Sequence, residues 1–282
     1  MMTFVACGPI QRTRQSEDTP VRTPETENLL INLKKVSARG FMFGHHDDTN
    51  YGIGWEGDEG RSDVKSVCGD YPAVISFDLG HIELGDTMSL DKVPFTKIRK
   101  EILNQYKRGG MSSLSWHLRN PLTGGDSWDV SDTTVVKSIL PGGANHEKFT
   151  GWVSKVSAFI NSLQTEEGVK VPVLFRPWHE HTGSWFWWGE KLCTPEEYKA
   201  LWHMTVDILR NDGVDNALYA YSPGSEPQDT AQYLKRYPGD ELIDLIGFDT
   251  YQFERDTYLA NLEKSLAIVD SIGKAVSYTH LR

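Results

Sequence analysis

The sequence predicts an α/β fold, specifically a (β/α)₈ TIM barrel in which about six of the eight strand–helix units are present. Short apolar runs typical of strands alternate with amphipathic helical stretches from residue 29 onward. Such alternation is typical of a parallel sheet. Polar residues follow the strands, at the end where barrels carry their sites. A doubly wound sheet fits less well, because no predicted strand leads directly into a Gly-x-Gly-x-x-Gly turn that opens a helix.

The individual elements follow from periodicity. Six apolar runs predict strands over residues 41–46, 73–78, 111–117, 171–178, 217–222 and 245–251. Apolar residues at helical spacing predict helices over residues 28–38, 92–107, 146–163, 195–210 and 256–272. Thr194 before Pro195 is a typical helix start, and Gly109-Gly110 and Gly273 are typical stops.

Composition excludes several classes of protein. The chain has 282 residues, with 29 Lys and Arg against 39 Asp and Glu, for a net charge of −10. An acidic chain without a basic run is a poor ligand for nucleic acid or an anionic membrane surface. No run approaches the ~18 apolar residues that a membrane span needs. Three cysteines are too few for a disulfide scaffold, and the sequence leaves open whether Cys68 and Cys193 pair.

The N-terminus predicts attachment to a membrane through lipid alone. A small residue, Cys7 and Gly8 resemble the end of a bacterial lipoprotein signal, in which the cysteine is lipidated, although a chance cysteine is the alternative. We therefore expect a signal remnant over residues 1–7, a flexible tether over 8–28 and a barrel over 29–273. The expected location is the bacterial cell envelope, either the periplasm or the cell surface. Residues 274–282 resemble a non-native tail.

The densest chemical segment follows the fourth predicted strand. It reads Arg-Pro-Trp-His-Glu-His-Thr-Gly-Ser-Trp-Phe-Trp-Trp-Gly over residues 176–189. Indole rings stack on the apolar faces of sugars, so such a loop favours carbohydrate binding. Glu180 beside these rings is a candidate general acid, since a partly apolar pocket keeps a carboxyl group protonated. The alternative is a surface glutamate in an aromatic crossover.

This segment closely resembles the acid/base motif of glycoside hydrolase family 26, chiefly β-mannanases. Ser-Trp-His-Leu-Arg-Asn-Pro over residues 115–121 and Gly-Phe-Asp-Thr-Tyr over residues 247–251 support the resemblance, which runs from about residue 29 to 273. It implies a retaining (β/α)₈ enzyme that acts on β-1,4-mannan or manno-oligosaccharides, as a monomer and without cofactor or metal. Mannan or another β-glycan, and endo or exo action, are left open.

The resemblance also implies roles for individual residues. Glu180 corresponds to the acid/base, and Cys7 is the separate lipidation candidate. The implied sugar contacts are His117, His179, Trp185, Asp249, Tyr251, Trp116 and Trp188. Tyr251 is implied to donate a hydrogen bond to the nucleophile. For several of these the alternative is structural: a core histidine at His117, a cap at Asp249, rim packing at Tyr251, and loop packing at Trp187 and Trp188. Asp78 and His45 are weaker candidates, because polar residues at strand ends often brace loops.

The nucleophile has no counterpart. Retaining glycosidases use two carboxylates, and the resemblance implies a glutamate after the seventh strand. The sequence has no Asp or Glu after Gly273, so the given chain is expected to lack hydrolytic competence. Two alternatives follow. One is a carbohydrate-binding barrel that does not cleave. The other is a metal-dependent barrel hydrolase that uses the His179-x-His181 pair with His45, His46, Asp47, Asp48, His117 and Asp249.

Overall fold

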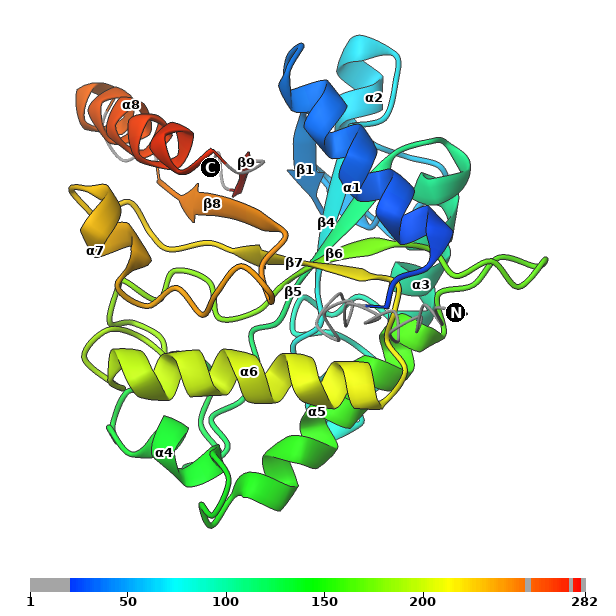
Figure 1. Ribbon diagram of the computed structural model, residues 1–282. Coiled ribbons are helices and arrows are strands. Elements are labelled where there is room, and N and C mark those ends of the chain that lie inside the picture. The colour runs from blue at the N-terminus through cyan, green and yellow to red at the C-terminus, as the bar shows by residue number, and fades with distance from the viewer. Residues whose placement is uncertain (1–20, 252–254, 274–275, 280–282) are drawn as a thin grey trace, which may run out of the picture.

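A parallel sheet organises the protein. The structure is a computed structural model that describes residues 21–251, 255–273 and 276–279 (Figure 1). Seven strands pair side by side and parallel in the order β1-β4-β5-β6-β7-β8-β9. They are β1 (Gly44–His46), β4 (Val74–Asp78), β5 (Met111–Ser115), β6 (Val173–Arg176), β7 (Ala217–Tyr221), β8 (Leu245–Asp249) and β9 (Val276–Thr279). The six predicted strands are confirmed, within a curled, partial barrel.

One helix precedes the first strand, and the other helices lie between or after the strands along the chain. The five longest, all predicted, are α1 (Pro24–Ser37), α3 (Phe95–Lys107), α5 (His146–Asn161), α6 (Pro195–Asn211) and α8 (Arg255–Ile272). The shorter elements are β2 (Tyr51–Gly52), β3 (Trp55–Glu56), α2 (Asp63–Cys68), η1 (Ile82–Leu84), α4 (Val135–Ile139) and α7 (Thr230–Leu234). The sequence did not indicate these, because such short segments show no clear period. Helix α1 begins inside the segment expected to be a tether, where the Thr23 side chain caps it.

The alternation of side chains divides the sheet into two faces. Ile75, Phe77, Leu114, Phe175 and Ile246 point to one face and join the large core beneath the covering helices. Residues of the other face, Met111, Leu174, Leu218 and Leu245, pack against Leu30 of α1. These four residues lie near the amino ends of their strands. Helix α1 therefore covers the amino end of this second face, which we call the inner face of the sheet. The carboxyl ends of the same strands carry polar residues and remain for the site.

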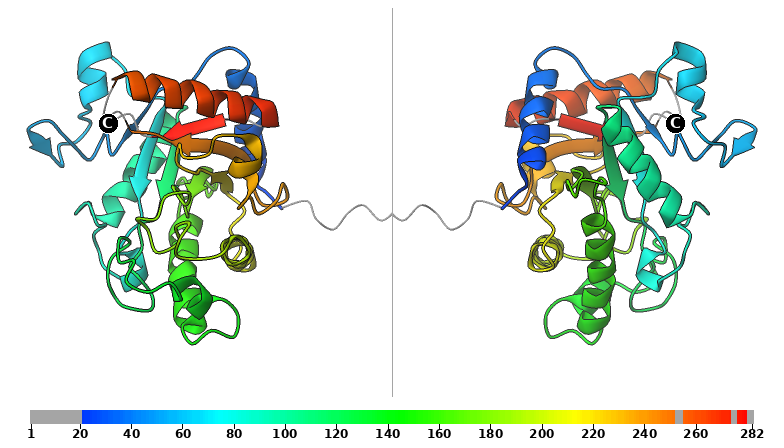
Figure 2. Two further views of the ribbon diagram at one scale, coloured as in Figure 1. Left: turned by 90° about the vertical axis from the view of Figure 1, so that its left-hand side faces the viewer. Right: turned by 90° about the vertical axis from the view of Figure 1, so that its right-hand side faces the viewer.

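Strand β9 is an addition to the predicted elements. It runs parallel to β8, with Ile246 opposite residue 276 and Asp249 opposite residue 279. Both side views show β9 next to β8 (Figure 2). The pairing adds a seventh strand to the six predicted ones, and the expectation of a non-native tail over residues 274–282 stays a prediction.

Two further observations bear on location and redox chemistry. Within the described ranges, no helix combines the length and apolarity needed to cross a membrane. Cys68 is exposed and Cys193 is buried, and both are free thiols. Cys7, the predicted lipidation site, lies outside the described residues.

Candidate active site

The loop after β6 presents Glu180 at the carboxyl edge of the sheet. Trp178 and Glu180 both have left-handed backbone conformations, with φ of 55° and 54°. Each costs a non-glycine residue on the order of 1 kcal/mol, so the surroundings must hold the loop in place. Tyr198 donates a hydrogen bond from its hydroxyl to the Trp178 carbonyl at 2.7 Å. The Glu180 N–H donates to the Ser222 carbonyl at 2.8 Å, which fixes the loop to the end of β7.

The Glu180 carboxylate is held by two donors. The hydroxyl of Tyr251, which follows β8, lies 2.5 Å from Oε1, and the indole Nε1 of Trp185 lies 2.9 Å from Oε2. Glu180 is only 3% exposed, whereas Trp185 is 37% exposed. Burial and the adjacent Glu180 carboxylate raise the pKa of Tyr251 well above its usual range, so the phenol keeps its proton and donates. The arrangement presents one fixed carboxyl group beside an accessible aromatic ring.

A chain of polar contacts fixes two histidines near the same edge. His117 Nδ1 lies 2.6 Å from Asp78 Oδ2, and its Nε2 lies 3.0 Å from His179 Nε2. Burial alone would raise the pKa of Asp78, but His117 and the donors Ser115 and Gly80 hold it well below its usual range. Because Asp78 is an acceptor, His117 donates from Nδ1 and its orientation is set. Asp78 thus positions His117, which agrees with its predicted bracing role.

Asp249 is part of a buried ion pair. Both of its carboxylate oxygens accept from Arg176 Nη1, at 3.1 and 2.9 Å, and Ser222 Oγ donates to Oδ2 at 2.9 Å. Arg176 ends β6 and Asp249 ends β8, so the pair joins two strands across the intervening β7. The structure gives Asp249 an internal partner, and its predicted contact with sugar stays a prediction.

The tryptophans separate into a buried and an accessible group. Trp116 and Trp188 were predicted to contact sugar, but both are fully buried. Trp116 donates from Nε1 to Glu83 at 3.0 Å, and Trp188 donates to the His179 carbonyl at 2.9 Å. They therefore support the site from beneath its surface, because packing covers both rings. Trp187 is likewise buried, which matches the packing alternative.

Trp128 was missed in the sequence. It lies in the loop after β5, is 50% exposed, and stacks on His117 with ring centroids 5.5 Å apart and planes 10° from parallel. Phe186 packs against both rings, at 5.4 Å from Trp128 and 5.3 Å from His117. A tryptophan in a long loop at a strand's carboxyl end was the available signal. Trp128 adds a second accessible aromatic surface beside that of Trp185.

The predicted metal pair does not assemble. His181 is fully buried between Tyr198 and Tyr221, with ring centroids at 4.4 and 4.9 Å. Burial and the nearby Arg236 push its pKa well below the usual value, so His181 is neutral. His179 instead faces His117, and neither His179 nor His181 belongs to the group of potential metal ligands found in the described part of the chain. The metal-dependent hydrolase alternative therefore loses the pair on which it depended.

A parallel, barrel-like sheet with a fixed carboxyl group and accessible indoles at its carboxyl edge defines the class of α/β-barrel carbohydrate-active proteins. The sequence profile of Glycosyl hydrolase family 26 matches residues 19–275. The chain belongs to this family.

Known relatives agree with this assignment. A mannan endo-1,4-beta-mannosidase of Bifidobacterium adolescentis is 37% identical over 236 residues, which are 81% of this chain and 23% of the relative. One from Bacillus subtilis is 27% identical over 244 residues, 81% of this chain and 64% of the relative. The chain thus spans less than two thirds of the length of these curated relatives.

Solved structures share the fold. The GH26 beta-mannanase BoMan26A from Bacteroides ovatus matches with a TM-score of 0.90 and 61% identity, over 92% of this chain and 76% of that one. A modular endo-beta-1,4-mannanase from Cellulomonas fimi matches with a TM-score of 0.83 and 35% identity, over 92% of this chain and 60% of that one.

Proposed function

We propose that the protein carrying this chain cleaves β-1,4-mannosidic bonds as a retaining glycoside hydrolase, with Glu180 as general acid and base. The observation that carries the proposal is the Glu180 carboxylate, buried and held between the Tyr251 hydroxyl and the Trp185 indole at the carboxyl edge of the strands. A carboxyl group in such a partly apolar place suits proton transfer near neutral pH. The named activity of the relatives supports mannan as the substrate class.

The chemistry proceeds in two displacements. Glu180 protonates the glycosidic oxygen while a second carboxylate attacks the anomeric carbon, and a covalent glycosyl intermediate forms. Glu180, now deprotonated, then takes a proton from the water that displaces the sugar. The sequence has no Asp or Glu after Gly273, where the family resemblance implies the nucleophile. We propose that the second carboxylate is the glutamate that the family resemblance implies after the seventh strand in the protein that carries this chain.

The proposed sugar contacts lie around this carboxyl group. Trp185 and Trp128 offer exposed indole faces, which suit the C–H faces of pyranose rings. His117 is a further proposed contact whose orientation Asp78 determines, whereas its neighbour His179, also predicted to contact sugar, is fully buried. Tyr251 is a further proposed contact, since its hydroxyl oxygen can accept a hydrogen bond from a sugar while it donates to Glu180.

A substitution of the acid tests the proposal. We expect the protein expressed from its complete gene to release reducing ends from mannan, and E180Q to lower the rate by about 10²–10⁴-fold. Manno-oligosaccharide binding by calorimetry should persist in E180Q, because the aromatic surfaces are unchanged. E190Q is the matched control, since Glu190 is an exposed glutamate near the end of the same loop, with a Lys235 partner. Undiminished turnover in E180Q would exclude the assigned role.

The cell-envelope location is a separate proposal, and it rests on sequence alone. We propose that Cys7 carries a lipid in the mature protein. C7S should then move the protein from the membrane fraction to the soluble fraction of the source bacterium. An unchanged distribution would contradict the anchor.

A further inference from the structure

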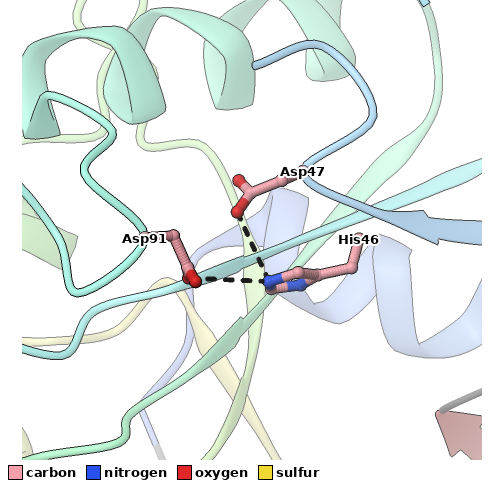
Figure 3. A group of neighbouring side chains, drawn as sticks. All are labelled: His46, Asp47 and Asp91. Carbon is pink, nitrogen blue, oxygen red and sulfur yellow. Dashed lines mark ion pairs between the residues drawn. The ribbon is translucent and has the colours of Figure 1, made fainter. Parts of the chain in front are cut away.

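Three side chains converge at the carboxyl end of β1, apart from Glu180 and its neighbours. His46 ends the strand, Asp47 follows it, and Asp91 comes from the loop between η1 and α3. In the described ranges, these residues form the group of at least three His, Cys, Asp or Glu whose ligating atoms all lie within 4.8 Å of one another. Figure 3 shows both carboxylates directed toward one imidazole nitrogen.

The separations fit ligands of a shared ion better than direct hydrogen bonds. His46 Nε2 lies 3.3 Å from Asp47 Oδ2 and 3.9 Å from Asp91 Oδ2. Charge-assisted N–H···O bonds are shorter, at about 2.7–2.9 Å. Nitrogen and oxygen ligands lie about 2.0–2.2 Å from zinc, so tetrahedral geometry separates them from one another by roughly 3.4 Å.

The surrounding contacts orient two of the three side chains. His46 Nδ1 lies 2.8 Å from Ser76 Oγ, so a proton on Nδ1 leaves the Nε2 lone pair facing the carboxylates. Asn50 Nδ2 donates to Asp47 Oδ1 at 2.7 Å, which leaves Oδ2 for His46. Hydrogen bonds of this kind commonly orient metal ligands. Asp47 also has a left-handed backbone, with φ of 49°, and its N–H donates to the Ser76 carbonyl.

The local charge and access also suit a cation. Asp47 is only 1% exposed, and two carboxylates share one imidazole, so the group has an excess of negative charge if the aspartates are ionised. Placing a buried carboxylate here is costly unless a positive charge offsets it. The side chains of His46 and Asp91 are 36% and 28% exposed, so an ion and its remaining water ligands can enter from solvent.

We propose that His46, Asp47 and Asp91 form a structural site for a divalent transition-metal ion of the zinc type. One imidazole with two carboxylates suits zinc, whereas magnesium and calcium favour all-oxygen sites. The ion ties the three-residue edge strand β1 to the loop that carries Asp91. This site departs from the expectation that the protein binds no metal. It shares His46 and Asp47 with the hydrolytic metal centre considered above, but it lacks the His179-x-His181 pair on which that centre depended and takes Asp91 as its third ligand.

Metal titration tests the site. The chain is stripped with a chelator, dialysed and titrated with Zn²⁺ by calorimetry, and its thermal midpoint is measured with and without Zn²⁺. We expect one ion per chain and a higher midpoint with the metal, because binding to the folded state alone stabilises it. Substitution of a residue that only orients a metal ligand typically lowers metal affinity by ~10–100-fold. D91N removes a proposed ligand itself, so it should weaken the Zn²⁺ affinity by at least this factor. D86N is the matched control, an exposed aspartate in the same loop that should bind as the wild type does.

A second pair of variants separates the site from adventitious binding to surface histidines. H46A should abolish the visible absorption bands of bound Co²⁺, whereas H45A, in the preceding residue of the strand, should retain them. Far-UV circular dichroism checks that each variant is folded. The proposal is overturned if the wild-type chain binds no Zn²⁺, or if stoichiometric binding survives in both D91N and H46A. Because no step uses mannan, these outcomes are independent of the proposed hydrolysis.

Discussion

Arg176 and Asp249 form a buried ion pair at the carboxyl ends of the strands, beneath the candidate site. Both are buried, and the pair joins β6 to β8 with Ser222 as an additional donor. Removing one partner of a buried pair leaves an uncompensated charge, which typically costs about 3–5 kcal/mol.

We therefore expect D249N to lower the free energy of unfolding by about 3–5 kcal/mol, as measured by urea denaturation. D58N is the control, because its partner Arg61 is exposed and such pairs contribute about 1 kcal/mol or less. Equal, small effects of the two substitutions would show that the buried pair has no special structural role.

The hydroxyl of Tyr251 is directed to Glu180. The bond from Tyr251 to the nucleophile, which the resemblance implies, stays a prediction, because the described residues include no nucleophile against which to test it. In this structure Tyr251 positions the proposed acid.

The loop between β6 and α6 owes its shape to close contacts. A Cβ atom placed on Gly183 would lie 2.2 Å from the Trp185 ring, so only glycine fits there without movement. Trp185 in turn donates to Glu180, so displacement of its ring would reach the carboxylate.

We expect G183A to weaken manno-oligosaccharide binding by roughly 10-fold, which corresponds to about 1.4 kcal/mol of binding free energy. We also expect it to lower the rate of mannan turnover. G151A is the matched control, because a Cβ there meets nothing within 4 Å. Calorimetry on both variants separates a loss of binding from a loss of catalysis. Wild-type binding by G183A would mean that the loop can adapt and that Trp185 is not held by this contact.

The elements that the sequence predicted are the long ones. Six strands and five helices followed from apolar runs and from apolar residues at helical spacing. The shorter helices and the two-residue strands β2 and β3 lack enough residues for a pattern. The motif around Glu180 identified the loop that carries the site. It did not indicate which tryptophan rings of the site are buried. Trp116 and Trp188 resemble sugar platforms in sequence, whereas the fold buries them and exposes Trp128 instead.

At the scale of the whole molecule, the two faces of the sheet are packed against helices, whereas its carboxyl edge carries the candidate site. Helix α1 covers the amino ends of the inner face, and the larger helices cover the outer face. The polar carboxyl edge remains, and the residues gathered there come from β4, β5, β6 and β8 and the loops that follow them. Periodicity alone could not identify the partners there, because contacts such as that of Asp78 with His117 join residues 39 positions apart.

Global stability should depend on pH through Asp78. Its pKa is depressed in the folded state, so its contribution is present above the unfolded carboxyl pKa of ~3.9 and is lost as the pH falls below that value. We expect the difference in unfolding free energy between the wild type and D78N to shrink between pH 5 and pH 3. A difference that grows on acidification would contradict the assigned sign.

The role of Glu180 is tested most directly by comparing two leaving groups on the protein expressed from its complete gene. A dinitrophenyl β-mannobioside needs no proton to release its phenolate, whereas mannan does. We predict that E180A loses about 10²–10⁴-fold on mannan, yet releases the first equivalent of dinitrophenolate within roughly 10-fold of the wild-type rate, as a burst before slow turnover. Equal losses on both substrates, or no loss on mannan, would contradict Glu180 as the acid and base.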